Sequence, residues 1–282
     1  MEREIIRKII IEGQEFVNEI PLIKRPFFFE KNGNYVFVGI RQAGKSYLLY
    51  QRIQQLIEEG HSIEEMVYIN FDDERLRQFT THDFDLILQA YASMFNLRPI
   101  LFFDEIQNIE GWENFARRLA NQKYNVYITG SNAKMLSREI ATTLGGRYWN
   151  ADVYPYSFFE YLKAKNITLA TNWMYGKQSA EVSKLFNDYF SFGGFPELVD
   201  IIAKRAWLND IYSKIFFSDL IVRNKIRNEE AMGLLVKRLA EGVKQPVSHT
   251  RLANLISTAG IKISKATIID FIKYLKESCL LF

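Results

Sequence analysis

Apolar residues in the first 155 positions follow two patterns that alternate along the chain. Short, unbroken apolar runs are typical of parallel strands buried on both faces, and they occupy residues 35–40, 66–71, 100–103 and 125–130. Between them, apolar positions recur every three or four residues, which predicts helices, within residues 48–57, 83–96 and 112–122. This alternation predicts an α/β domain with a mostly parallel sheet, which we expect over residues 35–155.

Residues 1–34 precede the first strand and form a separate predicted segment. Isoleucines at helical spacing predict an amphipathic helix over residues 2–19, and Pro21 and Pro26 then bracket a connector. Three phenylalanines follow at residues 27–29. They either pack in the core, which is the commoner role of phenylalanine, or lie near the base of a bound nucleotide.

Beyond the sheet domain, helical spacing predominates. We predict a helical linker over residues 156–228 and a separate module over residues 229–282. The module shows two helices, a turn, a third helix that starts after Ser264, and the start of a strand at residues 280–282. That order is typical of a winged helix-turn-helix. Because the sequence stops where a wing would begin, we expect it to be a fragment of a longer protein.

The first chemical motif lies between the first strand and the helix that follows it. The run from Gly39 to Ser46 fits the P-loop pattern G-x-x-x-x-G-K-[ST] without a mismatch. Two glycines let the loop curl so that its N–H groups point at a phosphate, and the helix N-terminus adds its positive dipole end. Lys45 would reach the β- and γ-phosphates, and the Ser46 hydroxyl would bind Mg²⁺. The predicted nucleotide-binding residues are Gly39, Ile40, Arg41, Gln42, Ala43, Gly44, Lys45, Ser46 and Tyr47.

The alternative for this stretch is an ordinary glycine turn before a helix, with a solvated lysine and serine. The complete match and the correct flanking elements favour a P-loop.

The second chemical motif is an apolar strand that ends in Asp104 and Glu105, the Walker B pattern. Asp104 at the end of the strand would hold Mg²⁺, and Glu105, one residue later, could polarise the attacking water. Apolar strands followed by an acid are common, so the motif is weak alone. The P-loop upstream makes it specific, against the alternative of two solvated carboxylates at a strand end.

Two further positions are candidates for contacts with the γ-phosphate. Ser131 and Asn132 follow the fourth predicted strand, and ligands bind at the carboxyl ends of parallel strands. Asn132 or a neighbour could instead cap a helix over residues 134–144. Arg147 follows two glycines on a predicted loop, where it could act as an arginine finger within the chain or from a neighbouring subunit. A structural salt bridge is the other interpretation of Arg147.

Composition places the chain among ordinary globular proteins, with 48% hydrophobic and 24% charged residues. The single cysteine, Cys279, excludes an intramolecular disulfide, suits a reducing compartment and is expected to be a small buried hydrophobe. The three histidines show no zinc-type spacing with it. No apolar run is long enough to span a bilayer, and the N-terminus is not a signal peptide, so we expect a cytoplasmic protein without membrane contact.

The charge is unevenly distributed. The whole chain has a net charge of +3, but residues 204–282 carry 14 Lys and Arg against 7 Asp and Glu. This excess indicates either contact with an acidic partner such as DNA or a solvated basic face. The last predicted helix has lysines but no Arg, Asn or Gln cluster at its start, which favours a packing or lid module over a DNA reader.

In its combination of motifs the chain resembles a family of AAA+-like ATPases of archaea and bacteria. These ATPases contain a P-loop module, a helical linker and a winged helix, and larger members end in a nuclease-like domain. The resemblance covers nearly the whole chain. It is carried by Gly39–Ser46, Phe103–Gln107 with Gly111 and Trp112, Thr129–Ser131, Gly146 and Arg147, Tyr154–Phe158, and Tyr189 with Gly193–Pro196.

The resemblance implies that the nucleotide is ATP, that Ser131 is the sensor residue and that Arg147 is the finger. It also implies that the Thr129 strand lies between the P-loop strand and the strand of Asp104 and Glu105. Many members have two arginines where this chain has Arg41 and Gln42, so a phosphate contact by Gln42 does not follow from the family. The nuclease-like domain is absent from this sequence.

Two functions from different classes fit these observations. The first is an Mg²⁺-dependent ATPase that moves the C-terminal module when it hydrolyses ATP. The second is a slowly hydrolysing, ATP-gated switch or DNA-binding regulator. A GTPase is disfavoured because no Asn-Lys-x-Asp motif follows the fourth strand, and a small-molecule kinase because no separate acceptor site is evident. If Arg147 acts between subunits, the protein is a homo-oligomer.

Overall fold

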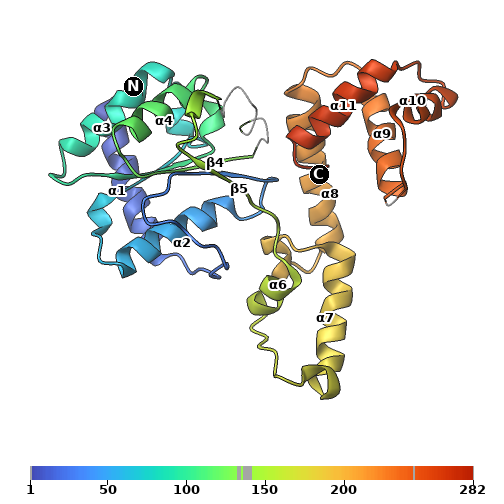
Figure 1. Ribbon diagram of the computed structural model, residues 1–282, viewed down its shortest axis with the longest axis horizontal. Helices are drawn as coiled ribbons and strands as arrows, with labels where there is room; N and C mark the ends of the chain where they lie inside the picture. Colours follow the sequence, from blue (N-terminus) through green and yellow to red (C-terminus); the bar gives the residue numbers. More distant parts are fainter. Residues whose placement is uncertain (1, 132–134, 136–141, 244, 282) are drawn as a thin grey trace. The chain divides into compact units, whose positions relative to one another are not determined.

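The computed structural model describes residues 2–131, 135, 142–243 and 245–281. The chain divides into two compact units, Met1–Ile202 and Ala203–Phe282. The first unit contains the sheet and a helical extension, and the described residues of the second unit form helices only (Figure 1).

Five parallel strands form one sheet in the order β2-β3-β4-β1-β5. They are β1 (Tyr35–Val38), β2 (Met66–Asn70), β3 (Ile100–Asp104), β4 (Val126–Gly130) and β5 (Trp149–Asp152). The parallel α/β fold is confirmed, and β4 lies between β3 and β1 as expected. Strand β5 was not predicted. Three of its four residues are exposed, so it has no apolar run, and its pairing with β1 defines it.

Helices pack on both faces of this sheet. They are α1 (Arg3–Glu19), α2 (Lys45–Glu58), α3 (Phe84–Ala92) and α4 (Trp112–Asn121). On one face, Phe37, Phe102 and Tyr127 form a core with apolar side chains of α2. On the other face, the rings of Phe103 and Phe115 of α4 have centroids 5.9 Å apart. Burial on both faces explains why the central strands are continuously apolar.

The phenylalanines of the connector belong to the core rather than to an open surface. Phe27 and Phe29 pack with Tyr35 and Phe37 of β1, and their ring centroids lie 4.7 Å from each other. Phe28 points outward and is 81% exposed. Core packing therefore accounts for Phe27 and Phe29, which is the first of the two interpretations considered from the sequence.

A helical extension completes the first unit. It contains α6 (Phe158–Ala164), η6 (Trp173–Tyr175), α7 (Gln178–Phe192) and η7 (Pro196–Val199). The Tyr156 N–H donates to the Gly194 carbonyl at 2.6 Å, and the Tyr189 hydroxyl donates to the Tyr156 carbonyl at 2.9 Å. A Cβ at Gly194 would lie 2.0 Å from that Tyr156 oxygen. Glycine is therefore required where the start of α6 meets the end of α7.

The second unit has its own core. Its elements are α8 (Lys204–Lys214), the π-helical η8 (Ile215–Val222), α9 (Glu229–Glu241), α10 (His249–Thr258) and α11 (Lys265–Glu277). Leu220, Leu235, Ile256 and Ile268 are buried together in this core. Ser264 caps α11 as predicted, because its Oγ accepts the Thr267 N–H at 3.0 Å.

The strand expected at residues 280–282 is not formed at Leu280 or Leu281, and Phe282 lies outside the described residues. The winged helix therefore stays a prediction. Cys279 is buried, as expected of a small hydrophobe. Within the described ranges, no helix is both long enough and apolar enough to cross a membrane.

Candidate nucleotide-binding site

The P-loop connects β1 to α2, and close backbone contacts determine its shape. A Cβ on Gly39 would lie 2.0 Å from the carbonyl oxygen of Val153, just after β5, so only glycine fits there. Gln42 and Gly44 have left-handed backbone conformations, with φ of +60° and +92°. Gly44 therefore curls the loop as predicted, whereas Gly39 is required by the close approach of a neighbouring strand.

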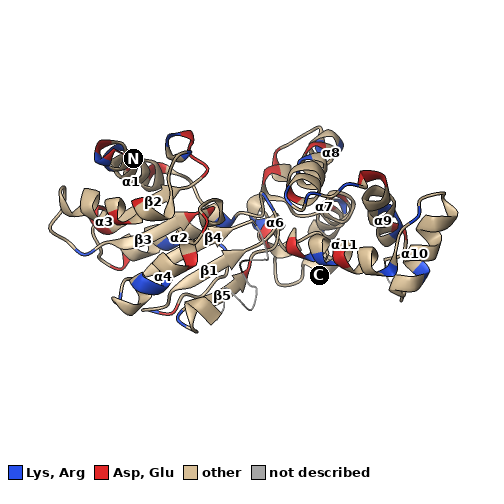
Figure 2. Cartoon of the chain, turned by 90° about the horizontal axis from the view of Figure 1, so that it is seen from above, with Lys and Arg blue, Asp and Glu red and all other residues tan. Residues whose placement is uncertain are grey.

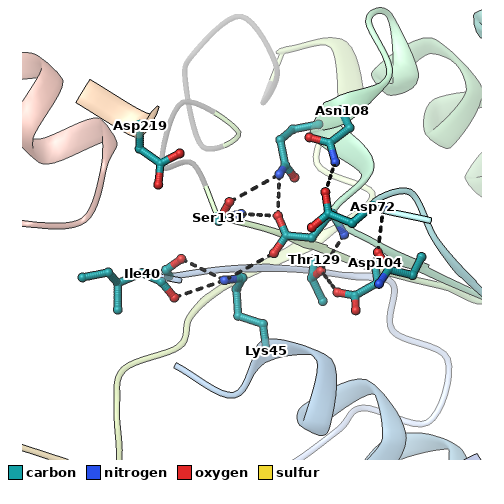
Figure 3. Close-up of polar contacts among 12 residues, drawn as sticks. Ile40, Lys45, Asp72, Asp104, Asn108, Thr129, Ser131 and Asp219 are labelled. Carbon is teal, nitrogen blue, oxygen red and sulfur yellow. Dashed lines mark hydrogen bonds and ion pairs between the residues drawn. The ribbon is translucent and has the colours of Figure 1, made fainter. Parts of the chain in front are cut away.

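Lys45 begins α2, and its side chain turns back over the loop. The residue is 4% exposed, and its ammonium donates to the carbonyls of Gly39 and Ile40 at 3.1 Å each (Figure 3). The same ammonium lies 3.6 Å from Glu105 Oε1. The cation thus stands where the P-loop and the end of β3 meet, which is where a phosphate would need it.

Asp104 ends β3 and is almost completely buried, with 1% of its surface exposed. It accepts hydrogen bonds from the hydroxyls of Thr129 and Tyr68, the second at 2.8 Å. Burial raises the pKa of this carboxyl, and the hydroxyls of Ser46, Thr129 and Tyr68 oppose that rise. The two predicted metal ligands, Ser46 and Asp104, therefore lie close to each other.

Glu105 leaves the strand through an unusual backbone conformation. Its φ of +51° is left-handed, which is uncommon for a residue with a side chain and frequent at functional sites. Its carboxylate accepts from Gln107 Nε2 at 2.5 Å and from the Ser131 N–H at 3.3 Å. Burial alone would raise the pKa of Glu105, but the Lys45 charge and these hydrogen bonds lower it. Glu105 is therefore ionised at neutral pH.

Thr129 links the two acids, and the sequence interpretation did not give it that role. Its buried hydroxyl donates to Asp104 Oδ1 and accepts the Glu105 N–H at 3.0 Å. One side chain of β4 therefore orients both consecutive acids at the end of β3. Gln107 was also missed as a site residue. Both lie within motifs that signalled the family, whereas Tyr68, in the middle of β2, had no such signal.

The remaining P-loop candidates lie around this centre. Ser131 follows β4, is 2% exposed and has its Oγ 3.4 Å from Gln107 Nε2. Arg41 is near enough for its charge to lower the pKa of Glu105. Tyr47, on the first turn of α2, is 51% exposed. Asn132 and most of the helix predicted over 134–144 lie outside the described residues.

Arg147 lies at the other end of the sheet. Trp149, two residues later, pairs with Tyr35 at the start of β1, and the Arg147 carbonyl accepts from Asn34 Nδ2 at 3.4 Å. The P-loop follows the last residue of β1, about 13 Å along the strand. The Arg147 guanidinium donates to the carbonyls of Leu144 and Gly145. The structure therefore does not bring Arg147 to Lys45 within one chain.

A second arginine, not singled out from the sequence, supports the P-loop from the connector. The Arg25 guanidinium donates to the Ala43 carbonyl at 3.2 Å, to the Tyr154 carbonyl at 2.9 Å and to Glu160 at 2.7 Å. Pro196 lies 3.7 Å from where a Cβ on Gly44 would stand. The connector, the P-loop and the helical extension of the first unit therefore meet around residues 43 and 44.

The donor set of this site fits a magnesium–triphosphate group. Ser46 and Asp104 present hard oxygen atoms close to each other, and Mg²⁺ is usually held by one or two protein oxygens together with phosphate oxygens. Lys45 adds a buried positive charge beside them. Ser46 and Asp104 would hold the ion, and residues 39–47 would surround the phosphates.

A family match covers much of the first unit. Residues 31–162 match the family model of the AAA domain, a range that includes the P-loop, all five strands and Glu105. This part of the chain, from the turn before β1 to α6, is therefore a AAA domain. Residues 183–282 match a different model, a domain of unknown function (DUF8612).

Two relatives are similar over nearly the whole of this chain. An uncharacterized protein of Methanocaldococcus jannaschii is 33% identical over 283 aligned positions, which cover 99% of this chain and 63% of that protein. An uncharacterized protein of Haemophilus influenzae is 30% identical over 279 positions, covering 98% of this chain and 66% of that protein. The chain thus spans slightly less than two thirds of the length of these relatives.

Solved structures with a similar arrangement are distant. The Aeropyrum pernix Orc1 protein in complex with DNA has a TM-score of 0.37 at 14% identity, covering 98% of this chain and 83% of Orc1. AMPPCP-bound DnaA from Aquifex aeolicus has a TM-score of 0.35 at 14% identity, covering 96% of this chain and 86% of DnaA. Likeness at this level does not extend to function.

Proposed function

We propose that the AAA domain binds ATP with Mg²⁺ and hydrolyses it. The observation that carries this proposal is the meeting of two motifs that are distant in the sequence. Lys45 Nζ lies 3.6 Å from Glu105 Oε1, and the Ser46 hydroxyl is near enough to Asp104 to oppose the rise in its pKa. This supports one site that combines a cation, two candidate metal ligands and an ionised carboxylate.

Each residue then has a distinct task. The N–H groups of residues 39–46 would hold the phosphates, and Lys45 would bind the β- and γ-phosphate oxygens. Mg²⁺, when bound, would neutralise charge on these oxygens. Glu105 would accept a proton from the attacking water, and its lowered pKa keeps the carboxylate in the ionised form that this step needs. Ser131, beside Glu105, would contact the γ-phosphate as a sensor.

The test is Glu105→Gln, which keeps the shape of the side chain but removes the base. We expect ATP binding to persist and turnover to fall by about 10²- to 10⁴-fold. Glu110→Gln is the matched control, because Glu110 is exposed and close in sequence, and it should leave turnover unchanged. Unaltered turnover in Glu105→Gln would refute the assignment of the base.

We further propose that hydrolysis moves a winged-helix module over residues 229–282 against the core over residues 35–155, with residues 156–228 as the linker. Separate cores in the two units support independent movement. Fluorophores on Lys31→Cys and Arg251→Cys, in a Cys279→Ser background, would report it by energy transfer. We expect the transfer efficiency to change with a magnesium–ATP analogue, and an unchanged efficiency would contradict the coupling.

A second candidate is an ATP-gated switch that binds DNA and hydrolyses ATP slowly. The specific observation is a set of basic, solvent-exposed positions on and between α10 and α11 (Figure 2): Arg251, Lys262, Lys265 and Lys273. DNA affinity should then fall steeply in a salt series. Absence of binding at low salt would exclude this candidate, and single-turnover hydrolysis with and without DNA separates it from the first. For either function we propose a cytoplasmic location, which the single buried cysteine fits.

A further inference from the structure

Two buried tyrosines form a hydrogen-bonded chain that ends on Asp104. The Tyr68 hydroxyl lies 2.8 Å from Asp104 Oδ2, and the Tyr50 hydroxyl lies 2.9 Å from that of Tyr68. A carboxylate only accepts hydrogen bonds, so Tyr68 donates to Asp104 and Tyr50 donates to Tyr68. Both residues are buried, with 7% and 8% exposed. Burial raises the pKa of Tyr50 to about 12 and that of Tyr68 well above its usual value, so both keep their protons.

This chain connects α2 to the end of β3. Ser46 and Tyr50 are four residues apart on α2 and therefore lie on the same face, one turn from each other. Tyr50 reaches Asp104 through Tyr68 of β2, and the Ser46 hydroxyl is near enough to Asp104 to oppose the rise in its pKa. The same face of α2 is thus turned toward this carboxylate.

The two oxygens of Asp104 are also fixed separately. Thr129 donates to Oδ1 from β4, and Tyr68 donates to Oδ2 from β2. Strands β4 and β2 are the two neighbours of β3 in the sheet. The carboxylate is therefore held from both sides and cannot rotate without the loss of a buried hydrogen bond.

We propose that Tyr68 is a positioning residue that orients Asp104 for Mg²⁺, and that Tyr50 holds Tyr68 in place. This inference rests on the proposed function, because it assigns Asp104 to the metal. The route through Tyr50 and Tyr68 keeps the carboxylate in register with α2 and therefore with the P-loop, without a bond from Ser46.

The experiment measures metal-dependent nucleotide binding in the full chain, without relying on turnover. A fluorescent ribose-labelled ATP analogue is titrated in EDTA and then at increasing MgCl₂. We expect Tyr68→Phe to bind the analogue in EDTA as the wild type does. It should need an Mg²⁺ concentration about 10- to 100-fold higher for the same increase in affinity for the analogue. Tyr50→Phe should show a smaller shift in the same direction, because Tyr68 still donates to Asp104.

Tyr148→Phe is the matched control. Its hydroxyl is also buried, but it donates to the Ala116 carbonyl rather than to the site, so its Mg²⁺ dependence should equal that of the wild type. A wild-type Mg²⁺ dependence in Tyr68→Phe would overturn the inference and leave the proposed function standing. If the wild type itself binds no nucleotide at any Mg²⁺ concentration, both fall. Should Tyr68→Phe fail to fold, an unshifted Tyr50→Phe overturns the inference.

Discussion

Lys45 and Glu105 form a buried ion pair, with 3.6 Å between Nζ and Oε1 and with side chains that are 3% and 15% exposed. Lys45 is the first residue of α2, and Glu105 directly follows β3. In the proposed function, a phosphate that binds Lys45 would compete with this carboxylate and with the carbonyls of Gly39 and Ile40.

Lys45→Met should remove this charge while the length of the side chain is retained. We expect ATP affinity to fall by roughly 10- to 100-fold, the range for a lost hydrogen bond to a charged group. Isothermal titration with MgATP measures it. Lys31→Met, at an exposed turn position, should bind as the wild type does, and equal affinities in the two variants would contradict the role of Lys45.

Thr129→Val should uncouple the two acids at the end of β3. It removes the hydroxyl that serves both Asp104 and Glu105, while the shape of the side chain is nearly unchanged. We expect kcat to fall by about 10- to 100-fold, as measured by phosphate release. Thr129→Ser keeps the hydroxyl and should restore most of the rate. Equal losses in both variants would indicate packing rather than hydrogen bonding.

Gly39→Ala should destabilise the AAA domain. The added Cβ would stand 2.0 Å from the Val153 carbonyl oxygen, and relief requires β5 or the P-loop to shift. We expect a loss of about 1–3 kcal/mol in the free energy of unfolding, the usual range for overpacking, measured by urea denaturation. Gly176→Ala is the control, because its nearest neighbour would lie at 3.8 Å. Equal stabilities would show that β5 does not press on the loop.

The Arg25–Glu160 pair should make stability depend on pH. Burial by itself would raise the pKa of Glu160, but hydrogen bonds from Arg25 and Ser157 lower it in the folded protein. A pKa that is lower in the folded protein stabilises the fold at pH values above the pKa of glutamate in the unfolded chain, about 4.3. This stabilisation is lost as the pH falls through the pKa of the folded protein. Glu160→Gln should therefore lower Tm at pH 7, with a difference that shrinks below about pH 4. Glu181→Gln, at an exposed position, should show no such trend.

Arg147 can reach a nucleotide only from another subunit if it acts as a finger. It lies at the end of the sheet opposite to the P-loop, with Asn34 as a neighbour. We propose a homo-oligomer in which it completes the adjacent site. Glu105→Gln and Arg147→Ala should then each be inactive alone and regain part of the activity when mixed. Sedimentation with and without ATP measures assembly, and a chain that stays monomeric in both conditions excludes the finger.

Much of the AAA domain could be predicted from local pattern. Strands β1 to β4 are almost continuously apolar because both of their faces are covered, and that burial is visible in the sequence. The P-loop and the Asp104–Glu105 pair were visible because their chemistry needs particular residue types at fixed spacing. Strand β5 was not predictable, since its exposed residues Trp149, Asn150 and Asp152 form no continuous apolar run.

The site shows the same division between sequence and structure. The sequence by itself determined the candidates for binding phosphate and metal, because Lys45, Ser46 and Asp104 have the side-chain chemistry for it wherever they lie. The tertiary structure alone decided which residues hold them. Tyr68, Thr129 and Arg25 act through contacts between strands or segments distant in the chain, and such contacts depend on sheet order and register. The tertiary structure also decided that Arg147 lies away from the site. Because β5 runs parallel to β1, the start of β5 and Arg147 just before it lie at the end of the sheet opposite to the P-loop.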